Sequence, residues 1–151
     1  MPPTLTKDEE ELIETLAQQI IDNYDFREPP VPIEQILKSP PPNLLGAIDI
    51  SDLSLVFGIG EHHHEYRLAV ARLLYREICR QESLHGVGKL PYNKAAAHHF
   101  AVALLIPRKW IKRAIRWPWV TLINVSEKFQ VPEYTMAARL AQMGRNVHGM
   151  D

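Results

Sequence analysis

One segment constrains the fold of this chain more than any other: residues 94–107, with the sequence KAAAHHFAVALLIP. Small and apolar side chains fill it almost continuously, which predicts a helix of about residues 93–106 that a neighbouring helix can approach closely. Pro107 suits the first turn of a further helix. We expect the side chains buried at this contact to be those of Ala97, Phe100, Ala101, Leu104 and Leu105. The expected partner helix covers about residues 61–82 and contributes Ala71, Leu74 and Ile78.

The remaining elements are expected from caps, periodicity and proline breaks. Thr6 and Glu9 have the spacing of a capping box before a helix with a 3.6-residue apolar period. Further helices are predicted after Pro32, over about 108–116, and on both sides of 130–132, the last ending at Gly144. Residues 44–57 alternate between apolar and polar positions and predict one or two short strands. The expected fold is therefore one mostly helical α+β domain, residues 1–151, with a small sheet.

Composition limits the class of protein. The chain has 151 residues, of which 46% are hydrophobic and 23% charged, as expected of a globular protein that buries its own core. Cys79 is the single cysteine, which excludes an internal disulfide and fits a reducing compartment. The sequence shows no leader pattern and no apolar run long enough for a membrane span, so a cytoplasmic location without membrane contact is expected.

Charge is distributed unevenly along the chain. Residues 1–60 carry 11 acidic and 3 basic side chains, whereas residues 61–151 carry 7 acidic and 14 basic ones. Such a division predicts either that the two halves pack against each other or that the basic half meets an anionic partner.

Two groups of basic residues are candidate binding sites. Arg72, Arg76 and Arg80 follow one line along a predicted helix. The alternatives for this line are a solvated stripe, an internal ion-pair network, or a cleft that binds an anion or a partner. The second group combines tryptophans with cations and could be a plain helix surface or contact nucleic acid by stacking and phosphate binding. It consists of Arg108, Lys109, Trp110, Lys112, Arg113, Arg116 and Trp117. The helix pair that follows resembles a helix-turn-helix, although its second helix offers only Arg139 as a basic contact.

The histidines form two short runs, His62 to His64 and His98-His99. Consecutive helical residues point about 100° apart, so neither run can chelate a metal as an i, i+4 pair does. We expect exposed or hydrogen-bonded histidines, with adventitious metal binding by His62 to His64 as the alternative. No metal and no cofactor is predicted.

Residues 94–107 also resemble the second signature of the ImmA/IrrE family of prokaryotic zinc metallopeptidases, E-x-x-A-N-x-F-A-x-x-L-L-M-P. The family's zinc helix, R-F-T-x-A-H-E-x-x-H, is similar to residues 66–77 in its flanks only. Arg72 and Arg76 stand at the two histidine positions, Leu73 at the glutamate, and Lys94 at the third ligand. The resemblance covers roughly residues 10–144 and implies a zincin-like scaffold.

Each of these replacements removes a function that zinc catalysis needs. Histidines at i and i+4 share one Zn²⁺, and the glutamate activates the bound water. Arginine stays protonated, leucine is no base, and lysine ligates only after losing its proton. The resemblance therefore implies a catalytically inactive regulator in prokaryotic mobile-element or stress-response gene control, with a protein partner, a repressor, in the old substrate cleft. A nucleic-acid-binding protein and a metallopeptidase with a non-standard site remain the alternatives.

Overall fold

The computed structural model describes residues 5–39, 63–80, 90–116 and 118–144. Seven helices and no β-strand occur within these ranges, so the mostly helical prediction is confirmed there. The helices are α1 (Lys7–Asn23), α2 (Ile33–Lys38), α4 (His63–Arg80), α6 (Lys94–Leu105), α7 (Arg108–Ala114), α8 (Leu122–Phe129) and α9 (Glu133–Gln142). The strands predicted over 44–57 lie outside the described residues, and the small sheet stays a prediction.

The helix ends follow the local sequence. Thr6 and Glu9 form the expected capping box, in which the Glu9 amide donates to Thr6 Oγ1 over 3.1 Å and the Thr6 amide to Glu9 Oε1 over 2.9 Å. Asn93 caps α6 by accepting a hydrogen bond from the Ala96 amide over 2.8 Å. Gly144 follows α9 with φ +68°, a left-handed conformation that glycine adopts without strain.

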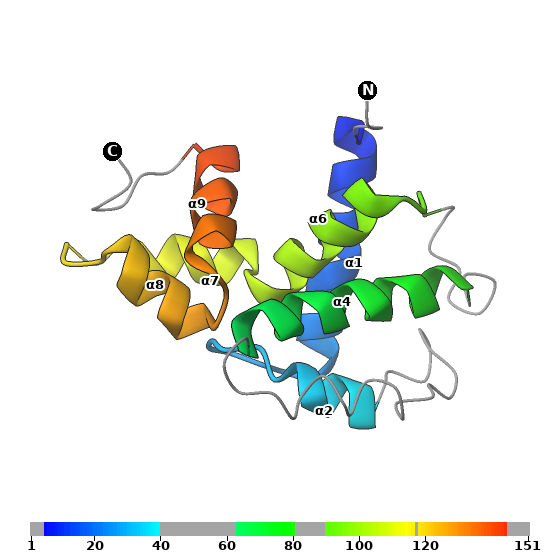
Figure 1. Ribbon diagram of the computed structural model, residues 1–151, viewed down its shortest axis with the longest axis horizontal. Helices are drawn as coiled ribbons and strands as arrows, with labels where there is room; N and C mark the ends of the chain where they lie inside the picture. Colours follow the sequence, from blue (N-terminus) through cyan, green and yellow to red (C-terminus); the bar gives the residue numbers. More distant parts are fainter. Residues whose placement is uncertain (1–4, 40–62, 81–89, 117, 145–151) are drawn as a thin grey trace.

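The centre of the core is the contact of α6 with α4 on one side and α1 on the other (Figure 1). Phe100, Ala101, Leu104 and Leu105 are completely buried, and Ala97 is partly buried. On α4, Ala71, Leu74 and Ile78 are buried as well. The ring of Phe100 lies 5.1 Å from that of Tyr75, centroid to centroid. The predicted pairing of these two helices is confirmed.

Helices α7, α8 and α9 form a second group beside this core (Figure 1). Gln130 ends α8 in the left-handed conformation, with φ 55°, so the chain turns sharply into α9. The buried Arg67 of α4 secures this turn by donating to the Gln130 carbonyl over 3.2 Å. It also donates to the Val31 carbonyl over 2.8 Å. One buried guanidinium thus joins α4, the α8–α9 turn and the segment before α2.

Among the described helices, none combines the length and the apolar character that a membrane span requires.

Candidate functional site: the α4–α6 cationic surface

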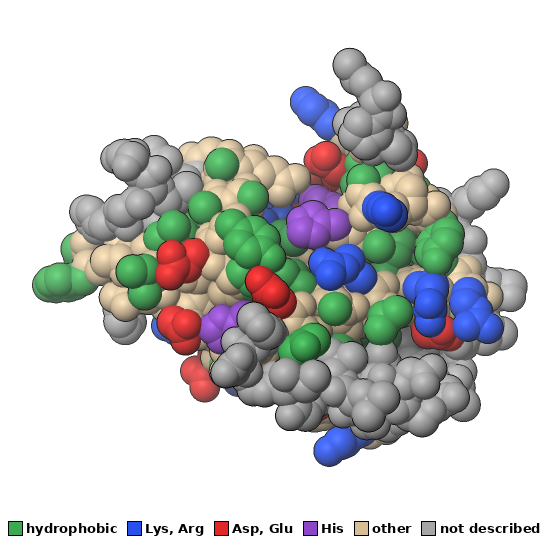
Figure 2. All heavy atoms as spheres, in the orientation of Figure 1, with side chains coloured by type: hydrophobic (Ala, Val, Ile, Leu, Met, Phe, Trp, Pro, Cys, Tyr) green, Lys and Arg blue, Asp and Glu red, His purple; other side chains and the backbone are tan. Residues whose placement is uncertain are grey.

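The predicted cation positions lie on two neighbouring helices, with three arginines on α4 and one lysine at the start of α6. We call Arg72, Arg76, Arg80, Lys94 and His98 the α4–α6 cationic surface. Arg72 is half-buried, whereas the other four side chains are exposed. Figure 2 shows basic and histidine side chains gathered over α4 and α6, with hydrophobic side chains between them. Leu73 packs against the core.

Arg72 is close enough to His98 to influence its protonation across the two helices. His98 is exposed as a residue, but partial desolvation of its ring lowers its pKa, and the positive charges of Arg72 and of the neighbouring His99 lower it further. A lowered histidine pKa means that the ring resists protonation beside the guanidinium. Arg72 itself forms no ion pair within the described ranges. The junction therefore presents one half-buried cation without an acidic partner in the described structure.

The other two arginines of the row share one acid. Glu77 lies 2.9 Å from Arg80 and 3.8 Å from Arg76, measured between its Oε1 and the nearest guanidinium nitrogen of each. Both arginines are exposed, so these contacts contribute little stability. Glu77 belongs to α4 itself. In the described structure, Arg76 and Arg80 therefore form no ion pair with an acid of the N-terminal half. Lys94 has no ion pair among the residues described.

The described histidines make no metal site. Nε2 of His63 lies 3.3 Å from Gln130 Oε1, and Nδ1 of His64 lies 3.9 Å from Glu127 Oε1, so both rings contact α8 and its turn. His63 is therefore a hydrogen-bonded histidine near a helix start, as interpreted, whereas His64 makes only the longer contact with an acid. His62 lies outside the described residues. Within residues 5–39, 63–80, 90–116 and 118–144, no three His, Cys, Asp or Glu side chains are grouped so that they could hold a metal ion.

A second charged cluster lies buried between α1, α6, α7 and α9. Glu14 of α1 accepts two hydrogen bonds from Arg139 of α9, one of them from Nη2 to Oε2 over 3.1 Å. Arg139 also donates to the Ile106 carbonyl at the end of α6, over 3.1 and 3.3 Å. Nε of Arg108 lies 3.4 Å from Glu14 Oε2. Glu14 is 8% exposed and Arg139 2%, so this is an ion pair removed from water.

His99 adds a polar group to this cluster. Its Nε2 is buried, lies 3.4 Å from Glu14 Oε1, and makes no hydrogen bond within the described structure. A hollow of about 440 Å³ opens above the cluster between α1, α7 and α9. The donors of Arg139 are already used within the protein, so we interpret the cluster as a structural connection between helices. It is the first of the two arrangements that the charge distribution predicted, the packing of the acidic half against the basic half.

The cluster makes stability depend on pH. Burial alone would raise the pKa of Glu14, but its contacts with His99, Arg139 and Arg108 outweigh burial and lower the pKa from 4.5 to about 2. A carboxyl with a lowered pKa in the folded state stabilises the protein above its ordinary pKa and loses that effect as pH falls. As the pH falls from about 4.5 to 2, we expect the protonation of Glu14 to lower the free energy of unfolding by roughly 1.4 kcal/mol per pH unit. Urea denaturation across this range measures the slope.

Glu14→Gln is the matched variant for this experiment, because it cannot titrate. The unfolding free energy of the variant should fall less steeply than that of the wild type as the pH decreases. The two slopes should differ by up to about 1.4 kcal/mol per pH unit, which corresponds to one proton. Equal slopes in both proteins would contradict a pair-stabilised Glu14.

Helix α7 differs from the predicted nucleic-acid surface. Trp110 is 5% exposed, so the expectation that it could stack on a base is wrong. Arg108 binds Glu11 over 2.6 Å, and Arg113 donates to the Arg27 carbonyl over 3.0 Å. Trp117 lies outside the described residues. Exposed cations remain at Lys109, Lys112 and Arg116.

Arg139 is also unavailable as a basic contact of a helix-turn-helix. In the sequence it was the one basic residue that the second helix of such a pair could offer to nucleic acid. The structure instead places it in the buried pair with Glu14. The acidic excess of the N-terminal half was the one signal in the sequence that could have indicated its partner.

Comparisons with known proteins add no assignment. No protein-family model, no curated protein and no solved structure matches this chain.

Proposed function

We propose that this chain is a non-catalytic protein-binding regulator that holds its partner on the α4–α6 cationic surface. The scaffold is taken to be of the ImmA/IrrE type, because residues 66–77 and 94–107 resemble that family's two motif helices. By the same resemblance, the partner is a transcriptional repressor and the setting is prokaryotic gene control.

The observation that carries this proposal is the position of Arg72. The resemblance places it at a zinc-binding histidine, and it lies half-buried at the junction of α4 and α6 without an acidic partner in the described ranges. A guanidinium without an acidic partner is free to bind an incoming carboxylate. A bound protein would supply that carboxylate.

The same positions argue against catalysis. Arginine at 72 and 76 offers no lone pair to a metal, and leucine at 73 accepts no proton from water. What the junction retains is the ability to bind an anion, since guanidinium groups match carboxylates in a bidentate geometry. A binding role uses the residues that are present.

The test is binding to a helix-turn-helix repressor encoded by a gene that flanks this one, where such a gene is found, measured by isothermal titration calorimetry. We expect stoichiometric binding to the wild type without repressor cleavage. Arg72→Gln should weaken it by about tenfold or more, because a hydrogen bond to a charged group contributes about 1.5–3 kcal/mol.

Lys109→Gln is the matched control, since it also removes one cation but from the exposed face of α7. It should bind as tightly as the wild type. Equal affinity of Arg72→Gln and the wild type would refute the proposed surface. Repressor cleavage that depends on zinc would refute the non-catalytic role.

A further inference from the structure

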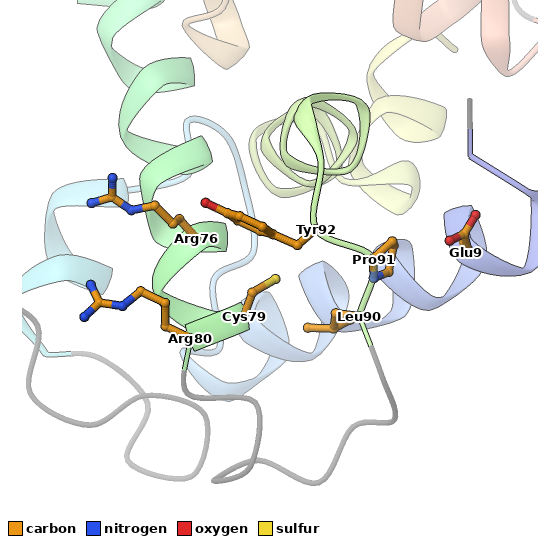
Figure 3. A pocket seen from close by; sticks show the side chains of 7 residues that line it. All are labelled: Glu9, Arg76, Cys79, Arg80, Leu90, Pro91 and Tyr92. Carbon is orange, nitrogen blue, oxygen red and sulfur yellow. The ribbon is translucent and has the colours of Figure 1, made fainter. Parts of the chain in front are cut away.

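A pocket of about 550 Å³ opens beside the α4–α6 cationic surface, at the end of α4 (Figure 3). We call it the Tyr92 pocket. It is lined by Glu9, Arg76, Cys79, Arg80, Leu90, Pro91 and Tyr92. The carbonyl of Pro91 accepts a hydrogen bond from Tyr75 over 2.5 Å, so the wall formed by residues 90–92 is attached to α4. A volume in this range suits one or two side chains or a small ligand.

The Tyr92 pocket is polarised from one end to the other. Figure 3 shows the side chains of Arg76 and Arg80 on one side, with their guanidinium groups extended away from Tyr92 and Cys79, and the carboxylate of Glu9 on the opposite side. Between them lie the ring of Tyr92, the thiol of Cys79 and the Pro91 ring. Tyr92 is 63% exposed, so its ring is open to contact by an incoming group. An occupant of this pocket is therefore apolar in the middle, and an anionic group beyond it on the arginine side can reach the guanidinium groups.

We infer that the Tyr92 pocket receives an apolar side chain of a protein partner whose adjacent acidic residue binds Arg76 and Arg80. This inference rests on the proposed function and names the chemistry that the partner must present there. An aromatic or leucine side chain would cover the Tyr92 ring and fill the apolar wall. Its neighbouring carboxylate would meet guanidinium groups that are both exposed.

Charge complementarity favours a peptide over an isolated small molecule. Arg72 precedes Arg76 by one helical turn on the same line of α4, so the cations continue beyond the pocket towards the α6 junction. An extended segment with acidic residues can follow this line, whereas a small carboxylate reaches only its end. The matching recognition element is an acidic stretch that ends in an apolar residue.

Glu77 competes with the carboxylates of such a segment for binding to Arg76 and Arg80. It lies 2.9 Å from Arg80 but 3.8 Å from Arg76, so Arg76 is the less occupied guanidinium. Exposed ion pairs of this kind contribute at most about 1 kcal/mol. A partner carboxylate can therefore displace Glu77 from Arg76 without disturbing the fold, and Arg76 is expected to be the main anchor.

The experiment is fluorescence anisotropy with a labelled acidic peptide that ends in Glu-Glu-Phe, titrated with the full chain. Two further peptides end in Glu-Glu-Ser and Gln-Gln-Phe. We expect the first to bind at least about tenfold more tightly than either other peptide, because both a buried apolar group and a charged hydrogen bond contribute. Unlabelled 3-phenylpropionate, as competitor, tests whether the carboxylate and ring suffice alone.

Variants of the pocket test which side chain binds the apolar group of the peptide and which binds its carboxylate. Tyr92→Ser should weaken the Phe peptide but leave the Ser peptide unchanged, and Arg76→Gln should weaken both. Lys109→Gln should change neither. Equal binding of the Phe and Ser peptides, or unaltered binding by Tyr92→Ser, would overturn the inference, as would competition by 3-phenylpropionate as strong as that by the unlabelled Glu-Glu-Phe peptide.

The outcome is separable from that of the proposed function. Repressor binding that depends on Arg72 but not on Tyr92 or Arg76 would refute the Tyr92 pocket alone. Selective peptide binding in the pocket, together with no repressor binding, would refute the proposed repressor partner alone.

Discussion

Glu14→Ala is expected to lower the free energy of unfolding by about 3–5 kcal/mol, as breaking a buried ion pair does. The variant leaves Arg139, which is 2% exposed, without the carboxylate that accepts two of its hydrogen bonds. It also removes the acid facing Arg108 and His99. Urea denaturation at pH 7, followed by circular dichroism, measures the loss.

Glu11→Ala is the matched control. Glu11 stands one helical turn from Glu14 on α1 and binds Arg108 over 2.6 Å, but it is exposed. Its removal should cost no more than about 1 kcal/mol. If both variants lose the same small amount, the buried pair does not hold α9 to α1.

A double variant separates the value of the pair from the cost of leaving one charge behind. Replacing Glu14 and Arg139 together by leucine and methionine leaves no buried charge from the pair. Such replacements are often neutral or stabilising. Recovery of most of the stability lost in Glu14→Ala is therefore expected, and an additive loss would indicate that the cluster supports more than this pair.

The helices of this chain were predictable because their signals are local. The capping box at Thr6 needs only residues three positions apart, and the small and apolar side chains of α6 follow one another within that helix. Gly144 and Pro107 mark helix boundaries through backbone properties that belong to one residue. Each of these signals is complete within about one helical turn.

The buried charges were not predictable in the same way. Glu14 and Arg139 are separated by 125 positions, and each is flanked by polar and apolar residues that suit a surface helix. Arg67 binds two carbonyls, and a carbonyl leaves no trace in the sequence because every residue has one. The charge imbalance between the halves indicated the contact but could not select the residues.

The cationic surface was predicted only in part. The helical line of Arg72, Arg76 and Arg80 follows from their spacing. The half-burial of Arg72 and its influence on His98 depend on how α6 lies against α4. The Tyr92 pocket depends likewise on residues 90–92, which no periodic pattern places beside α4.

Phe100→Ala is expected to cost about 3–5 kcal/mol of unfolding free energy, the usual range for a buried aromatic side chain. Phe100 is completely buried in α6, and its ring packs against that of Tyr75 on α4 at 5.1 Å. Alanine would leave a cavity at the centre of the α4–α6 contact, where both helices are already held by other close contacts and cannot collapse fully into the space. Urea denaturation at pH 7 provides the measurement.

Phe100→Leu serves as the control, because it retains an apolar side chain of intermediate volume, and its loss should be about 1.5 kcal/mol or less. A loss below about 1 kcal/mol for Phe100→Ala would contradict the helix pairing. The same pairing positions Arg72 against His98, so a destabilised α6 should also weaken anion binding at that junction. Phe100→Ala therefore tests whether the core contact and the cationic surface depend on one arrangement of two helices.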